Sequence, residues 1–248
     1  MHEGDWRVRG KEISRVEGLS DAVFGFAITL LIISLEVPTT AGEVLHAMRG
    51  FFAFAITFGL LFRVWRLQFG FFRRYGLEDN TTVNLTAVLL FVVLFFVYPL
   101  KFVFTAIMER VLAVAGFPDP AAPNLFRDER AATLMVTYAL GWMAVFGVFA
   151  LLYRHAYRKR VELQLSPLEE FDTRESIATN VFTASIGLPL GLTYIAADLA
   201  KRGRVADGIS VVMTVIMLAM LVALARWKRW RRGRRKELRA QIAAAVEA

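Results

Sequence analysis

The sequence predicts an all-α membrane protein with six transmembrane helices. Hydrophobic residues make up 56% of the 248-residue chain and the mean hydropathy is +0.48, more apolar than one soluble core would require. Apolar runs long enough to cross a bilayer recur along the chain. Basic residues gather at the ends of these runs and in particular connections, a pattern that encodes membrane topology.

The predicted spans cover about residues 15–37, 44–65, 83–107, 131–153, 177–197 and 209–225. The first begins with ionisable residues and ends at Pro38, and the second ends in the aromatic and basic anchor Arg63, Trp65 and Arg66. A linker is expected over residues 68–82 and a long Pro-rich loop over residues 108–130. A further loop, with Pro167, Glu169, Glu170 and Asp172, precedes the fifth span.

Asn84 lies near the entry of the third span. An amide at membrane depth is costly unless it is paired, so we expect it to meet a polar partner in another helix. Such a contact could be a packing clasp that touches no ion.

Six spans place both termini on one side of the membrane, and the larger number of basic residues predicts that this side is cytoplasmic in the cell membrane. Residues 226–236 interleave Trp227 and Trp230 with arginine and lysine, which is typical of a segment held at anionic lipids. Nucleic acid is the weaker explanation, because a juxtamembrane position accounts for the same charges. We therefore expect a transmembrane domain over residues 1–230 and a basic cytoplasmic tail over residues 231–248.

The residue content argues against an enzyme or a metal site. Cysteine is absent, which excludes disulfides, thiolate ligands and cysteine nucleophiles, and the three histidines show no ligand spacing. Ser20 and Asp21 are adjacent, so on a helix their side chains diverge by about 100° and cannot form a nucleophile–base pair. We expect Arg15, Ser20 and Asp21 to form a polar clasp that joins helices, because a charge in a span needs a partner. No metal and no cofactor are expected.

On a helix, the first span carries two stripes. The apolar stripe consists of Phe26, Leu30 and Ile33 with Thr29 beside them, and the small stripe consists of Gly18, Ala22, Gly25 and Thr29. The first could face a partner or a pore while the second allows close packing. Alternatively, both stripes simply pack against neighbouring helices.

Ion conduction is the best-supported function. The chain has no Thr-Val-Gly-Tyr-Gly filter of the P-loop type and no span with an arginine at every third residue. A pore walled by one helix per subunit requires a closed oligomer. The alternative functions are a secondary transporter and a non-conducting membrane scaffold, but repeated halves and midplane carboxylates, which a transporter should show, are not evident.

The motif Arg15-x-x-x-Leu19-Ser20-Asp21 resembles the Arg-x-x-x-Phe-Ser-Asp signature that opens the first helix of the transmembrane protein 175 potassium channels. Residues 22–31 are also similar to that helix, and Leu19 replaces the usual Phe. In this family a Trp is followed three residues later by His, whereas Trp65 here is followed by Gln68. Trp65, Gln68 and Asn84 are expected to be supporting polar contacts near the start of the first helix.

The resemblance implies a homotetrameric, potassium-permeable cation channel with the first helices around the axis. It implies a hydrophobic gate five residues after the signature Asp, at Phe26, with Thr29, Leu30 and Ile33 as the next pore-lining layers. A ring of four phenyl groups could dewet the pore or admit cations across the ring faces. Potassium is then the permeant ion.

Overall fold

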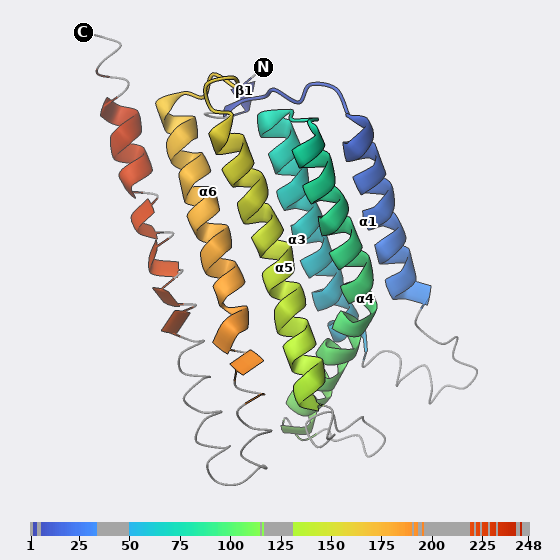
Figure 1. Cartoon of the computed structure of the whole chain (residues 1–248). Helices are drawn as coiled ribbons and strands as arrows, with labels where there is room; N and C mark the ends of the chain where they lie inside the picture. The colour runs from blue at the N-terminus through green and yellow to red at the C-terminus, as the bar shows by residue number, and fades with distance from the viewer. Residues whose placement is uncertain are drawn as a thin grey trace.

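The computed structural model describes residues 2–3, 6–33, 50–114, 116, 131–189, 191–192 and 195, and parts of 219–244. Within this part of the chain the long elements are helices that lie side by side in a bundle (Figure 1). A short antiparallel hairpin, β1 (His2–Glu3) and β2 (Trp6–Arg7), covers one end of it. The helices are α1 (Arg15–Ile33), α3 (Phe51–Tyr75), α4 (Asn80–Val114), α5 (Ala131–Arg158) and α6 (Pro167–Ser185).

The bundle has one end where α1, α4 and α6 begin and α3 and α5 finish (Figure 1). We call this the polar end. Helix α4 contacts α1, α3 and α5, and α6 packs along α5. Basic residues in the last turns of α3 and α5, and acidic residues in the first turn of α6, complement the helix dipoles there.

Three helical segments of the described chain are long and apolar enough to cross a membrane: Phe51–Tyr75, Asn80–Val97 and Thr133–Arg158. They coincide with the second, third and fourth predicted spans. The sixth predicted span, about residues 209–225, lies mostly outside the described residues. Residues 34–49, which include the end of the first predicted span and the start of the second, also lie outside them.

Helix α3 continues past its predicted end. The linker expected to begin at Gln68 is wrong up to Tyr75, because the helix ends only at Gly76. Gly76 adopts a left-handed conformation with φ 57°, and its N–H donates to the Phe72 carbonyl at 2.8 Å. Arg73 and Arg74, which were expected to lie in the linker, instead belong to the last turn of α3.

Two other predicted loops are also partly helical. Helix α4 continues to Val114, so the loop expected from Met108 starts later than predicted. Helix α6 begins at Pro167 with a capping box, in which Ser166 Oγ accepts from Glu169 N–H at 3.3 Å and Glu169 Oε2 accepts from Ser166 N–H at 2.9 Å. The acidic residues assigned to a loop therefore form the first turn of a helix.

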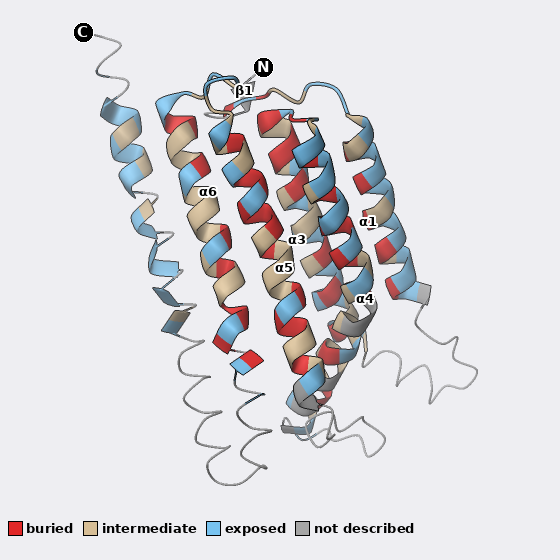
Figure 2. Cartoon of the chain, viewed as in Figure 1, coloured by how far each residue is buried: buried red, intermediate tan, exposed pale blue. Residues whose placement is uncertain are grey.

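The core lies between α1, α3, α4 and α5 and is extended by Trp6 of β2 (Figure 2). Because lipid tails are as apolar as these side chains, close packing rather than escape from water holds the helices together within a membrane. Fully or almost fully buried members are Phe24, Ala27, Leu31, Phe71, Phe72, Tyr75, Leu89, Phe149 and Leu152.

Candidate functional site

Helix α1 has one buried and one exposed face (Figure 2). Phe24, Ala27 and Leu31, at helical spacing, are at most 2% exposed and pack into the core. Phe26 is 57% and Leu30 36% exposed on the other side. The rotation of α1 about its own axis therefore directs the apolar stripe away from the bundle of its own subunit.

The small stripe shares this exposed side. Gly18, Ala22 and Gly25 are exposed, and a Cβ atom built on either glycine meets no atom within 4 Å. Thr29 is also exposed, and its hydroxyl donates to the Gly25 carbonyl at 2.9 Å. The side chain of Ile33 lies outside the described ones. Neither stripe, as far as it is described, packs against a helix of the same subunit.

A buried hydrogen bond joins α1 to α3 near the polar end. Gln68 Nε2 donates to Ser20 Oγ at 2.9 Å, and Ser20 Oγ donates to the Val16 carbonyl at 2.7 Å. Both side chains are almost fully buried. Gln68 Oε1 is buried without a hydrogen-bond partner in the described part of the chain.

A second hydrogen bond joins the same two helices. Trp65 Nε1 donates to Asp21 Oδ1 at 2.7 Å. Trp65 is positioned by neighbours on its own helix, because its ring lies 5.2 Å from Phe62 and 5.5 Å from Phe69 between centroids. The indole N–H is thus directed at the carboxylate of α1.

Two predicted site residues do not join these contacts. Arg15 is exposed at the first turn of α1 and forms no hydrogen bond or ion pair with another described residue. The predicted clasp of Arg15, Ser20 and Asp21 is therefore replaced, within the described chain, by two separate bonds from Ser20 and Asp21 to α3. Asn84 is exposed on α4, and the polar partner expected for it in another helix is not found among the described residues.

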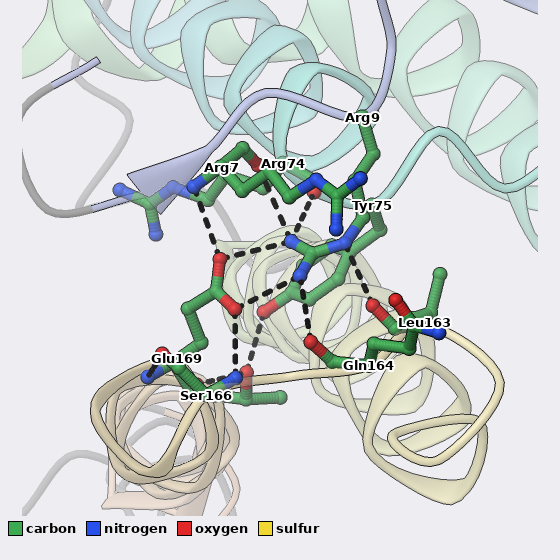
Figure 3. A network of polar contacts seen from close by, with 9 residues as sticks. Arg7, Arg9, Arg74, Tyr75, Leu163, Gln164, Ser166 and Glu169 are labelled. Carbon is green, nitrogen blue, oxygen red and sulfur yellow. Dashed lines mark hydrogen bonds and ion pairs between the residues drawn. The ribbon is translucent and has the colours of Figure 1, made fainter. Parts of the chain in front are cut away.

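A polar network at the polar end was not predicted from the sequence (Figure 3). Both terminal nitrogens of Arg9 donate to Glu169, each at 2.9 Å, and Nε donates to the Leu163 carbonyl at 2.9 Å. Glu169 also accepts from the Arg7 N–H at 3.1 Å. The Ser-x-x-Glu spacing at Ser166 was the available sequence pattern, but nothing local marks Arg9 as its partner.

Electrostatics follow from this geometry. Burial acts to raise the pKa of Glu169, but hydrogen bonds from Arg9, Ser166 and Arg7 outweigh it and hold the pKa below the usual range. Asp79, in the connection between α3 and α4, behaves similarly. Burial acts to raise the pKa of Asp79, but hydrogen bonds from Thr82, His155 and Lys159 outweigh burial. The pKa of Asp79 is therefore held well below its usual range.

Comparisons with known proteins identify the family. The family model for the endosomal/lysosomal potassium channel TMEM175 matches residues 15–99. A potassium channel from Marivirga tractuosa is 40% identical over 182 residues, which cover 73% of this chain and 74% of that relative. The chain belongs to the TMEM175 potassium channel family.

Two solved structures of TMEM175 proteins resemble the bundle. A variant of the potassium channel MtTMEM175, crystallised with a nanobody–MBP fusion, shares 33% identity with a TM-score of 0.77, covering 92% of this chain and 98% of that one. A TMEM175 homologue from Chamaesiphon minutus, at 19% identity with a TM-score of 0.52, shares the fold over 85% of this chain and 96% of its own.

The TMEM175 match contains the two hydrogen bonds described above, since residues 15–99 include α1, α3 and much of α4. The predicted family resemblance is confirmed. The relatives are potassium channels, so the prediction that the chain is not an enzyme is also confirmed. Among the described residues, no group of three or more His, Asp or Glu side chains could hold a metal ion.

Proposed function

We propose that this TMEM175 protein is a homotetrameric, potassium-permeable cation channel whose four α1 helices surround the pore. The observation that carries the proposal is the exposed apolar stripe of α1. Phe26 and Leu30 are exposed on the side of α1 that faces away from the bundle of their own subunit. Helix α1 is also the first helix of the region that matches the family model. One such helix cannot enclose a path, and symmetry-related copies can.

The gate follows from the order of the residues along α1. Phe26 forms the constriction, with Thr29, Leu30 and Ile33 as the next layers. A ring of phenyl groups excludes water when it is narrow, so the pore closes by dewetting at Phe26. Thr29 adds a hydroxyl oxygen that, while donating to Gly25, still has lone pairs to offer a passing cation.

The proposed topology has six spans in the cell membrane, with the polar end and both termini in the cytoplasm. Arginines at the polar end support this orientation through the positive-inside rule. We propose residues 1–230 as the transmembrane domain and residues 231–248 as the tail, with the outward basic side chains of the C-terminal segment at anionic lipids. Exposed members of that set are Arg226, Arg229, Arg234, Lys236 and Arg239.

Currents through the purified protein in liposomes test the gate. Phe26→Ala widens the constriction and lowers the dewetting barrier, so we expect potassium current to rise about 10-fold, the effect of about 1.4 kcal/mol on a barrier. Phe91→Ala is the matched control, because Phe91 is 69% exposed on α4, and it should leave the current unchanged.

Unchanged current in Phe26→Ala would contradict the pore assignment. Absence of any potassium current from the wild-type protein would favour a transporter or a non-conducting scaffold instead. A current equally permeable to sodium would contradict potassium preference while leaving the pore in place.

A further inference from the structure

A basic groove of about 700 Å³ lies near the polar end. Its walls come from α3, α5, α6 and the helical C-terminal segment. No Asp or Glu is among the described residues that line it. Its arginines are Arg63, Arg66, Arg73, Arg74 and Arg231.

The guanidinium groups of this groove are poorly neutralised within the chain. Arg63 and Arg66 are exposed and form no hydrogen bond or ion pair with another described residue. Arg73 donates through Nη1 to the Gly10 carbonyl at 2.9 Å, but its buried Nε has no partner in the described part. Arg231 Nε is 4.0 Å from Glu175 Oε2, a long distance for an ion pair. Arg63 and Arg66 are one helical turn apart on α3, so their like charges lie close together and repel. The groove therefore favours an anion.

The α6 wall supplies neutral polar groups opposite the arginines. Thr179 Oγ1 accepts from Arg231 at 3.4 Å, and Asn180 and Ser176 line the same wall. The amide of Asn180 donates to the Ser176 carbonyl at 2.8 Å, which leaves its oxygen available as an acceptor. Arginines facing hydroxyl and amide groups suit a phosphate that carries hydroxyl substituents.

The basic groove continues into an apolar groove of about 340 Å³ between α3, α4 and α5. The two grooves share Arg63 and Phe146. On α3 the two grooves overlap, because the basic groove is lined from Gly59 to Arg74 and the apolar groove by residues 60–64. On α5 they follow one another, since the basic groove reaches Tyr153 toward the polar end and the apolar groove runs from Phe146 away from that end to Met135. Leu100, Phe104 and Met135 are among the side chains that line its deeper part.

We propose that the two grooves together bind one anionic phospholipid. The arginines of the basic groove hold its phosphate, and the apolar groove takes an acyl chain. The arginines and the hydroxyl-bearing wall near the polar end match the headgroup of an amphiphile. The apolar groove, which lies farther from that end, matches its acyl chain. The site is separate from the outward face of the C-terminal segment and does not depend on whether α1 conducts.

Lipid binding to the purified full-length protein tests the proposal directly. We expect long-chain phosphatidylglycerol to raise the melting temperature in detergent, and phosphatidylcholine of equal chain length to have little effect. Arg63→Gln with Arg66→Gln should weaken the apparent affinity for phosphatidylglycerol about 30-fold, at about 1 kcal/mol for each arginine. Arg154→Gln with Arg158→Gln, which removes the same charge from exposed positions of α5 outside both grooves, should leave it nearly unchanged.

Several outcomes would overturn the site. Phosphatidylcholine also carries a phosphate, which its choline cation balances, so equal stabilisation by this lipid would show that the net negative charge of the headgroup plays no part. Equal loss in both double variants would indicate attraction to net charge alone. Full stabilisation by inorganic phosphate, or by a monomeric short-chain phosphatidylglycerol, would remove the apolar groove from the site. Cross-linking of Arg66→Cys between copies, in the cysteine-free chain, would assign the groove to a neighbouring subunit.

Discussion

At the scale of single residues, Ser20 and Asp21 set the rotation of α1. Their side chains leave the helix about 100° apart, so they meet different residues of α3. Ser20 pairs with Gln68 inside the bundle, and Asp21 pairs with Trp65 nearer the surface. Two bonds at different angles prevent α1 from turning about its axis. They thereby keep Phe26 on the exposed side.

Trp65→Phe tests this role of the indole N–H. The phenyl ring keeps the packing with Phe62 and Phe69 but donates no hydrogen bond to Asp21. Because the acceptor is a carboxylate that stays partly solvated, we expect a loss of about 1–2 kcal/mol in the free energy of unfolding. Denaturant unfolding in detergent measures it.

A double-mutant cycle with Asp21→Ala provides the control. If the two side chains act through their mutual bond, the second substitution should add little to the first. Fully additive losses would show that Asp21 and Trp65 stabilise the protein independently.

At the scale of elements, the segment after β2 ties the N-terminus to the polar end. Arg9 and Gly10 donate through their backbone N–H groups to the Arg73 carbonyl at 3.1 and 3.3 Å. A Cβ atom on Gly10 would clash with the Phe72 carbonyl oxygen, so only glycine permits this approach. Arg9 then reaches across to Glu169 and joins the ends of α3, α5 and α6.

Glu169→Gln tests this tie. Breaking a buried ion pair leaves Arg9 without its countercharge, although backbone carbonyls still accept from it, so we expect a loss of about 3 kcal/mol near pH 7. Unfolding of wild type and variant over a pH series measures the difference. Glu162→Gln, at an exposed pair with Lys159, should change stability by less than about 0.5 kcal/mol.

The pH dependence has a definite sign. The folded-state pKa of Glu169 lies below its ordinary value of 4.5, so the stability from its ionised form is fully present above about pH 4.5. It is lost as the pH falls through the lowered pKa. The gap between wild type and Glu169→Gln should therefore narrow in acid, and a gap that widens there would contradict the assignment.

At the scale of the whole molecule, we propose that other copies of the chain cover the exposed stripes of α1. Phe26 and Leu30 stand beside the small stripe, on which glycine Cβ positions are open. Small residues allow helix backbones to approach closely in a membrane. An apolar stripe beside a small stripe is better suited to close packing between α1 helices around one axis than to contact with lipid.

Cysteine cross-linking tests the assembly. The chain contains no cysteine, so a single Phe26→Cys substitution reports only on that position. In a tetramer with α1 at the axis, a short bifunctional thiol reagent should join copies through residue 26 into covalent dimers and larger species. Leu140→Cys, on an exposed α5 position at 59%, should give little product. Equal cross-linking at both positions would contradict the axial placement of α1.

The amino-acid sequence alone determined the family and three of the apolar helices, and it placed Trp65 and Gln68 near the start of α1. It did not identify their partners there, because Arg15 and Asn84 take no part in these contacts. Hydropathy and charge act locally along the chain, and the signature around Ser20 and Asp21 is contiguous, so the family and these helices are visible without a fold. Helix ends were less visible. The continuation of α3 to Tyr75 and the start of α6 at Pro167 depended on a left-handed glycine and a reciprocal cap.

Only the tertiary structure decided which side of α1 is covered and where long-range partners lie. Arg9 and Glu169 are 160 residues apart in the sequence, and no local pattern indicates that they form a pair. The basic groove likewise collects arginines from α3 and from the C-terminal segment. Contacts of this kind arise from the packing of whole helices, because packing brings together side chains that the sequence keeps far apart.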